Sequence, residues 1–419
     1  MSHKANGAPG IIACPGGEDF TNDLVGHLKH IYLRRVDKKA KTLAEKYDKT
    51  PDEIMWMLSL NEDLKTYKGV NGHEKAGHSH KPPCFKINTS FTRFANGEYK
   101  AEILSSIRGM DIYIIQDMEN HLPLQFSGSK SAERFELNVN EHFFCLLVTV
   151  DAAIQAGAAS VTVVLPSYPY SRQHKKKGRE GVTAIKIGQI LEFLGVKRII
   201  TLDIHSRDIS NGFRRLHLED LHASYQILLK LSAIIDLKDP DLVVVAPDAG
   251  AVDRNKFYAS SLSRPLALLY KERDYSRISH NAGNNNIVSM RLLGSVKDKI
   301  VFMADDILGT GSTLITAMKL LKEMGARKVI CAISIPLFTG DAISHFEEAH
   351  NQKLFDMIIG TNSVRHDERL LDKSWYVQAD VSNLFARIIS RLHYHLSLSE
   401  LLDNRKIIQH LLSAKAKNA

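Results

Sequence analysis

The chain alternates between amphipathic stretches and short apolar runs, and one arrangement of the two occurs three times. Each time, an amphipathic stretch ends in Gly, a few residues follow, and a run of five mostly apolar residues begins. The three pairs are Val139–Gly157 with Val161–Leu165, Val182–Gly195 with Arg198–Leu202, and Leu314–Gly325 with Lys328–Ala332. Gly at the end of a helical pattern supplies a left-handed cap. We therefore predict a helix followed by a strand at each of these places.

The apolar runs are continuous and rich in β-branched residues, which is typical of strands buried on both faces of a parallel sheet. Further runs of this kind are Ile112–Gln116, Leu242–Ala246, Leu266–Tyr270, Ile300–Ala304 and Met357–Gly360. Helices that alternate with such strands predict an α/β fold of the doubly wound type, with parallel sheets flanked by helices.

The predicted strands form two groups, one before roughly Phe213 and one after roughly Leu216. We therefore predict two similar α/β domains, residues 8–215 and residues 216–382. The remaining residues, 383–419, continue a helical stretch, and we expect this helix to pack back on the N-terminal domain.

One segment, at about residues 34–86, departs from the α/β pattern, because it is first charged and helical and then loop-like. We interpret it as an insertion in the first domain. His73, His78, His80 and Cys84 cluster there and could bind zinc. Their spacing matches no standard structural zinc site, so a solvated His-rich loop is the simpler interpretation.

Composition indicates a globular protein of the cytoplasm, since hydrophobic residues make up 44% of the chain and charged residues 24%. The longest apolar candidate for a membrane span, Phe143 to Val150, is too short, and the first residues do not resemble a secretory signal. Four scattered cysteines are best explained as reduced thiols. The formal charge of +8 suits polyanionic small substrates, and no recognisable nucleic-acid module accompanies it.

The strongest chemical signal follows the apolar run Ile300–Ala304. Two adjacent carboxylates, Asp305 and Asp306, come first, then a tight turn, and then a helical pattern. Carboxylates at the end of a strand can accept hydrogen bonds from the vicinal hydroxyls of a ribose. The turn can direct backbone N–H groups at a phosphate, assisted by the helix N-terminus and by three hydroxyls; its residues are Gly309, Thr310, Gly311, Ser312 and Thr313. An ordinary capped strand-to-helix turn is the alternative.

This stretch resembles the phosphoribosyl-binding loop that type I phosphoribosyltransferases share with ribose-phosphate diphosphokinases. The resemblance implies a phosphoribosyltransferase-like fold in both domains. The loop alone does not separate the two classes of enzyme, but other segments resemble the diphosphokinases.

Four such segments carry that resemblance. Arg172-Gln173 is similar to the pair that meets ATP, and His205 is similar to a residue at the nucleotide's metal and triphosphate. The turn of Asp248, Ala249 and Gly250 resembles the loop that receives the diphosphate, with Asp248 as a second metal-associated residue. Lys271 and Arg273 match cations on a flexible loop that closes over the reacting phosphates.

A further segment in the first domain, with Phe94, Asn96 and Glu98, resembles a loop that reaches the adenine of a neighbouring subunit's ATP. The resemblance implies a homo-oligomer, often a hexamer in the family. The sequence departs from the family at Asn96 and His174, where Asp is usual, and at Gly309, where many members have a third Asp. The first two changes bear on the preference for the nucleotide.

The resemblance implies an Mg²⁺-dependent transfer of diphosphate from ATP to the C1 hydroxyl of ribose 5-phosphate, which gives 5-phosphoribosyl 1-diphosphate and AMP. The ribose 5-phosphate would meet Asp305, Asp306 and residues 309–313. Two alternatives stay open at this stage. One is a catalytically silent regulatory subunit of such an enzyme, and the other is a phosphoribosyltransferase.

Overall fold

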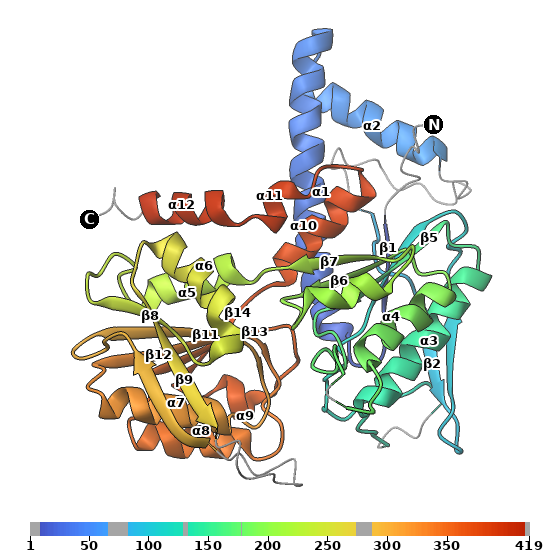
Figure 1. The fold of residues 1–419 in the computed structure, drawn as a ribbon. Helices are drawn as coiled ribbons and strands as arrows, with labels where there is room; N and C mark the ends of the chain where they lie inside the picture. Colours follow the sequence, from blue (N-terminus) through green and yellow to red (C-terminus); the bar gives the residue numbers. More distant parts are fainter. Residues whose placement is uncertain (1–8, 66–82, 129–132, 177, 274–286, 415–419) are drawn as a thin grey trace.

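The computed structural model describes residues 9–65, 83–128, 133–176, 178–273 and 287–414, which form two α/β domains side by side (Figure 1). In the described part of the first domain, five parallel strands form a sheet in the order β1-β4-β5-β6-β7. These strands are β1 (Gly10–Ala13), β4 (Asp111–Ile115), β5 (Ser160–Leu165), β6 (Arg198–Leu202) and β7 (His217–Leu221).

Both faces of this sheet are buried, which explains why its strands are continuously apolar. Alternate residues such as Ile112 and Ile114 meet the helices α3 (Val139–Gln155) and α4 (Thr183–Phe193). The residues between them, such as Tyr113 and Ile115, meet the other face, where α1 (Glu18–Tyr47) and α10 (Ser382–His393) lie.

The second domain contains a larger sheet, in which seven described strands follow the order β10-β9-β8-β11-β12-β13-β14. All neighbouring strands are parallel except β9 and β10. The strands are β8 (Leu242–Ala246), β9 (Leu266–Arg273), β10 (Ile287–Leu293), β11 (Ile300–Leu308), β12 (Lys328–Pro336), β13 (Met357–Thr361) and β14 (Tyr376–Ala379). The doubly wound α/β fold with parallel sheets is therefore confirmed.

Helices cover both faces of this second sheet. One face packs on α7 (Ser312–Glu323), α8 (Ala342–Asn351) and the short α9 (Glu368–Leu371). The other face packs on α5 (Ser224–Ile234) and α6 (Val252–Leu262), whose apolar residues join those of α1 and α10 in one core. The main hydrophobic core is therefore shared by both domains.

The three predicted helix–strand pairs are present, as α3 with β5, α4 with β6, and α7 with β12. The glycines between them adopt the left-handed backbone that the prediction requires, with φ of 83° at Gly157, 98° at Gly195 and 87° at Gly325. The N-terminus of α3 is also fixed by sequence, because Asn138 and Glu141 form a reciprocal capping box.

Three predicted boundaries differ from the structure. The strand expected to end at Ala304 continues as β11 to Leu308, so Asp305 and Asp306 lie inside it. The strand expected to end at Tyr270 continues as β9 to Arg273. Residues 217–221, placed in the second domain by the sequence, pair with β6 as the last strand of the first sheet. Apolar content reveals the buried core of a strand, whereas pairing also extends over its polar ends.

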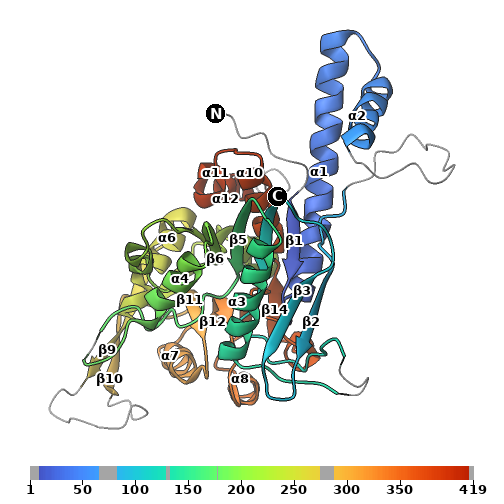
Figure 2. The same ribbon diagram turned by 90° about the vertical axis from the view of Figure 1, so that its right-hand side faces the viewer.

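The smaller elements lie around these two sheets. A two-stranded antiparallel hairpin, β2 and β3, projects from the first domain, and α2 lies beside the outer part of α1 (Figure 2). The bounds are β2 (Thr89–Arg93), β3 (Tyr99–Ile103), α2 (Pro51–Lys65), α11 (Ser399–Leu402), α12 (Arg405–Ala414), and the 3₁₀ turns η1 (Arg207–Gly212) and η2 (Ala249–Ala251).

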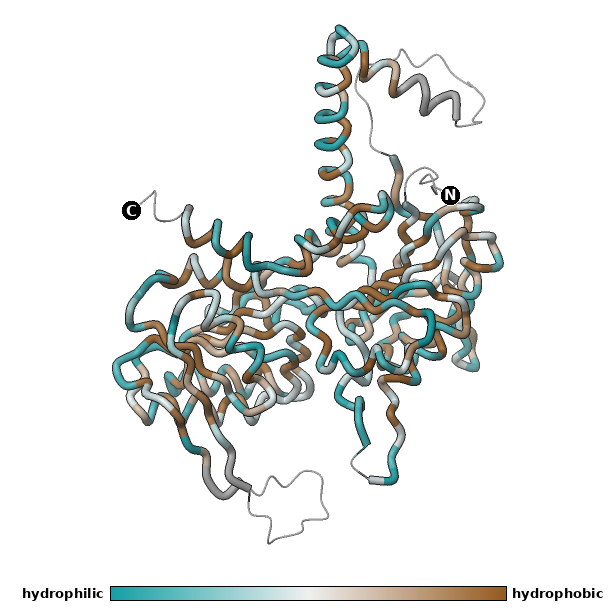
Figure 3. The backbone as a smooth tube through the Cα atoms, turned by 45° about the horizontal axis from the view of Figure 1, so that its top comes forward, coloured by the Kyte–Doolittle hydropathy of each residue, from teal (hydrophilic) through white to brown (hydrophobic). Residues whose placement is uncertain are grey.

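The segment predicted as an insertion begins within a continuous helix. The first half of α1 buries Phe20, Leu24 and Leu28 in the shared core. Its outer half projects from the body of the molecule, carries many hydrophilic residues (Figure 3), and packs with α2 around a small cluster that includes Ala40, Ala44 and Ile54. The inserted segment therefore begins where the residues of α1 become less buried, and the helix itself continues without a break.

The segment after residue 382 contacts both domains. Helix α10 packs against α1, where the rings of Phe20 and Phe385 meet edge to face at 5.3 Å. Helix α12 instead contacts α5 and α6 of the second domain. Within the described residues, no helix combines the length and the apolar character needed to cross a membrane.

A buried carboxylate also joins the two domains. Asp203, which follows β6, lies 3.0 Å from Nη1 of Arg254 on α6 and 2.9 Å from Nδ1 of His222. Its Oδ2 accepts a hydrogen bond of 2.5 Å from the Ser334 hydroxyl on β12. Burial acts to raise the pKa of Asp203, but Arg254, His222 and Ser334 outweigh it and hold that pKa well below its usual range.

We predict that Arg254→Met lowers the free energy of unfolding by about 3 kcal/mol, because removal of one partner leaves a buried charge without its ion pair. Lys41→Met is the matched control, since Lys41 pairs with Asp37 at 3.0 Å but both side chains are more than 60% exposed. It should cost less than about 1 kcal/mol. Urea unfolding followed by circular dichroism measures both values, and equal losses would contradict the prediction.

Candidate active site

A cavity of about 290 Å³ lies at the carboxyl ends of the central strands of the second sheet. In an open α/β sheet this edge is where ligands usually bind. Strands β8 and β11 contribute carboxylates, the start of α7 closes one side, and Arg172 reaches in from the first domain. The lining residues are Arg172, Pro247, Asp248, Asp305, Ile307, Leu308, Gly309, Thr310, Gly311, Ser312, Thr313, Leu314 and Ile333.

The two adjacent carboxylates of β11 have different surroundings. Successive side chains of a strand point to opposite sides, and Asp305 lines the cavity. Asp306 Oδ2 instead lies 2.7 Å from Nδ1 of His205, which belongs to the first domain. Asp306 is also under the electrostatic influence of Arg254. The pair therefore presents one carboxylate to the cavity and one to the domain contact.

These surroundings shift the pKa of each carboxylate in a different direction. Burial, followed by the negative charges of Asp306 and Asp248, raises the pKa of Asp305 well above its usual range. Burial would also raise the pKa of Asp306, but the hydrogen bond with His205 and the charge of Arg254 lower it. Asp306 is thus the ionised member, and its neighbour His205 holds its proton on Nδ1.

The loop from Gly309 to Thr313 has the features of a phosphate cradle. Gly311, the N-cap of α7, has a φ of 76°, a conformation that favours glycine. A Cβ atom there would lie 2.2 Å from Cε2 of the buried Phe346. Because Gly311 has no side chain, nothing at this position covers the free N–H groups at the start of α7. These N–H groups and the helix dipole face the cavity.

Two residues of the first domain, Arg172 and His205, lie at or beside this cavity. Arg172 Nη2 donates a hydrogen bond of 3.0 Å to the carbonyl of Ile307, and His205 contacts Asp306. The adjacent Gln173 is exposed and does not line the cavity. The site thus depends on contact between two domains that are far apart in sequence.

Known proteins match this chain along most of its length. A model for the N-terminal domain of ribose phosphate pyrophosphokinase matches residues 82–195, and a phosphoribosyl transferase domain matches residues 215–369. Ribose-phosphate pyrophosphokinase A of Dictyostelium discoideum is 32% identical over 315 residues, which cover 75% of this chain and 89% of that protein. The chain belongs to the ribose-phosphate pyrophosphokinase family.

Other similar proteins agree with this family. The ribose-phosphate pyrophosphokinase of Mycoplasma genitalium is 34% identical over 326 residues, or 76% of this chain and 90% of that protein. The crystal structure of phosphoribosylpyrophosphate synthetase from Mycobacterium smegmatis superposes with a TM-score of 0.65 at 23% identity, covering 93% of this chain and all of that one. The latter likeness shows the shared fold.

Some of the predicted site residues do not line the cavity, and the side chains of two others are not described. Phe94, Asn96 and Glu98 form the tip of the β2–β3 hairpin, where Asn96 Oδ1 accepts a hydrogen bond from the Glu98 N–H. They do not line the cavity of this chain. Lys271 and Arg273 lie on paired residues of β9, opposite Met290 and Ile287 of β10, and not on a loop. The structure describes their backbone but not their side chains.

The zinc alternative rests mainly on undescribed residues, since His73, His78 and His80 lie outside the described ranges. The Cys84 thiol is described and donates to the Lys86 carbonyl. Within the described ranges, no group of three or more His, Cys, Asp or Glu side chains could hold a metal ion by itself. A metal ion at the cavity would therefore take further ligands from substrate oxygens and water.

The residues that line the cavity could hold Mg²⁺ together with substrate oxygens and water. This ion prefers oxygen ligands and is commonly held by one or two carboxylates together with substrate phosphates. Burial raises the pKa of Asp305, and the nearby charges of Asp306 and Asp248 raise it further. A divalent cation would relieve the repulsion between these carboxylates. Asp248, whose Oδ1 also accepts a hydrogen bond from the Ala251 N–H, is the described carboxylate best placed for this role at the end of β8.

Two residues that position the site, Arg254 and Asn255, gave no signal in the sequence. Arg254 pairs with Asp203 across the domain contact and places a positive charge near Asp306. Asn255 is fully buried and makes reciprocal hydrogen bonds of 2.8 and 2.9 Å with the backbone of Ala304, immediately before Asp305. The polar pair Arg254-Asn255 resembles any solvated helix surface until its burial is known.

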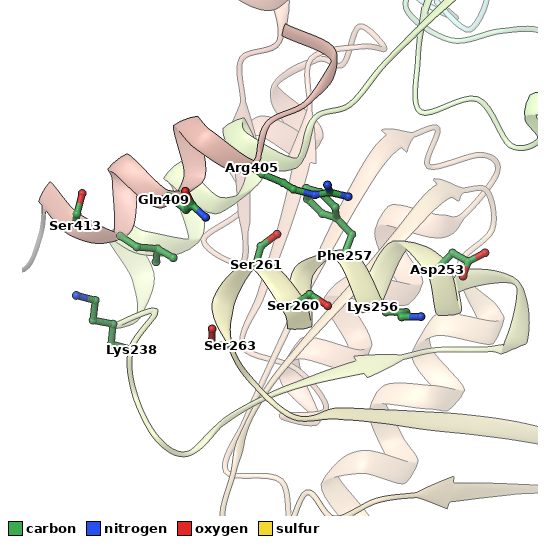
Figure 4. A pocket seen from close by; sticks show the side chains of 11 residues that line it. Lys238, Asp253, Lys256, Phe257, Ser260, Ser261, Ser263, Arg405, Gln409 and Ser413 are labelled. Atoms are coloured by element: carbon green, nitrogen blue, oxygen red, sulfur yellow. The ribbon is translucent and has the colours of Figure 1, made fainter. Parts of the chain in front are cut away.

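A larger cavity, of about 750 Å³, lies between α6 and α12 (Figure 4). Lys238, Lys256 and Arg405 line it together with several serines. It contains none of the residues predicted to carry chemistry, and it has no phosphate loop. The smaller cavity at β8, β11 and α7 is therefore the candidate active site.

We predict that Gly311→Ala costs at least about 2 kcal/mol of stability, because alanine is strained at positive φ and its methyl group would overlap Phe346. Gly309→Ala is the matched control in the same loop. A Cβ there meets only Thr339 Oγ1 at 3.5 Å and Arg172 Nη1 at 3.7 Å, both ordinary contacts. Thermal unfolding of both variants checks the difference, and equal midpoints would refute the cradle geometry.

A pH series tests the two carboxylates. A carboxyl group whose pKa is higher in the folded protein than in the unfolded chain, where it is about 4, stabilises the folded state when the pH is below about 4. This stabilisation is lost as the pH rises through the pKa of the folded state. Asp305→Asn should therefore be more stable than the parent at about pH 8, by about 1 kcal/mol or more, and not at about pH 4. Asp306 has a lowered pKa, so Asp306→Asn should be less stable than the parent at the higher pH. Unfolding midpoints of both variants are compared with that of the parent at each pH. If both differences had the same sign at every pH, the assigned pKa directions of Asp305 and Asp306 would be contradicted.

Proposed function

We propose that this protein transfers a diphosphate group from ATP to the C1 hydroxyl of ribose 5-phosphate, giving 5-phosphoribosyl 1-diphosphate and AMP. The observation that carries the proposal is the single cavity in which Asp305, Asp248 and the loop of residues 309–313 meet Arg172 of the other domain. Membership of the ribose-phosphate pyrophosphokinase family supports the same reaction.

The sugar phosphate would bind on the second domain. Backbone N–H groups and hydroxyls of residues 309–313 would hold the 5-phosphate, since a helix N-terminus favours an anion. Asp305 and Asp306 would accept hydrogen bonds from the ribose hydroxyls. Asp248, Ala249 and Gly250 lie at the end of the neighbouring strand β8, where they would meet the incoming diphosphate.

The nucleotide would bind against the first domain. Arg172 offers a guanidinium fork for phosphate or for stacking on the base, and Gln173 can bond to an adenine edge. The hairpin with Phe94, Asn96 and Glu98 lies away from the cavity of its own chain, which is compatible with contact to the ATP of a neighbouring subunit. We therefore include a homo-oligomer in the proposal.

The reaction needs positioning and neutralisation of charge more than covalent chemistry. The ribose O1 attacks the β-phosphorus in line, the bond to the bridging oxygen of AMP breaks, and the hydroxyl releases its proton. Bound Mg²⁺ would neutralise the charge that develops on the phosphate oxygens, with Asp248 and His205 as its protein ligands. Lys271 and Arg273 at the end of β9 would stabilise the transferring group.

The proposed location is the cytoplasm. Cys14, Cys145 and Cys331 are buried free thiols, and burial raises the pKa of Cys145 to about 12. Such inert thiols are typical of a reducing compartment.

The decisive experiment measures AMP release from MgATP with and without ribose 5-phosphate. We expect AMP only when the sugar phosphate is present, and we expect Lys271→Ala to lower kcat at least about 100-fold with an unchanged melting temperature. Equal AMP release without the sugar, or none with it, would overturn the proposal. Full activity of Lys271→Ala would remove that residue from the catalytic group.

A further inference from the structure

The histidine that follows Arg172-Gln173 lies against the histidine of the domain contact. The ring centroids of His174 and His205 are 5.1 Å apart, with their planes at 65°. His174 lies in the segment after β5 and His205 in the segment after β6, so adjacent parallel strands bring the two rings to the same sheet edge. Neither ring belongs to the hydrophobic core.

The two imidazoles have complementary hydrogen-bonding states. Asp306 accepts the Nδ1–H of His205, which leaves the lone pair of His205 Nε2 available. A histidine whose second nitrogen is held by a carboxylate is the usual arrangement of a metal ligand. Nδ1 of His174 is buried and makes no hydrogen bond of ordinary geometry to any described residue. The fold alone thus leaves a nitrogen of each ring without a partner.

An imidazole ring binds a metal through a nitrogen lone pair. The separation of the rings also suits one shared ion. With a metal–nitrogen bond of about 2.1 Å and cis angles of about 90–110°, two imidazole centroids lie about 4.5–5.2 Å apart.

We propose that His174 and His205 form a two-nitrogen site for a divalent transition-metal ion, such as Co²⁺ or Mn²⁺, that binds together with the triphosphate of ATP. Imidazole nitrogen favours such ions over Mg²⁺, which prefers oxygen. His174 would therefore determine which metal–nucleotide complex the protein selects. The inference rests on the proposed function, because phosphate oxygens complete the ligand set that the protein side chains do not complete by themselves.

The test measures binding and not turnover. The protein is titrated with Co²⁺ or Mg²⁺ in the presence of α,β-methylene-ATP, whose α–β bridge cannot be cleaved. The Co²⁺ complex is then examined by proton NMR in H₂O, where each ligated imidazole gives one exchangeable, strongly shifted N–H signal. We expect two such signals from the parent protein and one from His174→Phe.

We expect His174→Phe to weaken Co²⁺ binding at least about tenfold while Mg²⁺ binding changes less than about twofold. His174→Asp supplies an oxygen ligand and should shift the ratio of affinities further toward Mg²⁺. His345→Phe is the matched control, because His345 is an exposed histidine on α8, and it should change neither affinity nor the number of signals. Circular dichroism establishes that each variant is folded.

Two results would overturn the inference while leaving the proposed function intact. One is unchanged Co²⁺ affinity and two N–H signals in both His174 variants. The other is an equal loss of Co²⁺ and Mg²⁺ affinity in both variants, which would make His174 a structural residue. Failure of α,β-methylene-ATP to bind the parent protein would instead overturn the proposed function as well.

Discussion

The carboxylates of Asp203 and Asp306 come from different domains, and both depend on the guanidinium of Arg254. Arg254 pairs with Asp203 at 3.0 Å and places its positive charge near Asp306, which in turn holds His205. A buried carboxylate without such partners costs several kcal/mol. The two domains must therefore stay in contact for these buried charges to be paired. The same contact fixes the position of the residues around the cavity.

This constraint explains why the cavity is formed by several separate parts of the chain. The second domain supplies the carboxylates and the loop of residues 309–313, whereas Arg172 and His205 come from the first domain. The shared hydrophobic core, to which α1, α5, α6 and α10 all contribute, keeps the two sheets in this arrangement. Substrates that bind on different domains would then meet at the line where the sheets face each other.

The outer half of α1, α2 and α12, which lie outside the matched family domains, are peripheral to this cavity. The outer half of α1 and α2 project away from the body, and α12 lies along α5 and α6 (Figures 1 and 2). They add surface and a second cavity without contributing to the lining of the first. The arrangement of the carboxylates, the loop of residues 309–313, Arg172 and His205 thus involves none of these additions.

The sequence by itself determined the α/β class, most strand positions, and the turn of residues 309–313 between a strand and a helix. Buried parallel strands are apolar throughout, glycines end the helices, and the pair Asp305-Asp306 stands directly before the loop, so each of these features has a local pattern. Local patterns also fail in a definite way. Strand ends that are polar, as in β7, β9 and the second half of β11, look like loops because hydrogen bonding with a neighbouring strand is not visible in one segment.

Only the tertiary structure decided which polar residues act together. Asp305 and Asp306 are adjacent and chemically identical in the sequence, yet one lines the cavity and the other holds His205, because strand geometry and the opposite domain give them different neighbours. Arg254 and Asn255 carry no local signal, and their importance comes from burial beside β11. The contact between His174 and His205 likewise arises from two strands that neighbour each other in the sheet but are more than 30 residues apart in the chain. Charge pairing and burial depend on distance in space, which the order of residues alone does not contain.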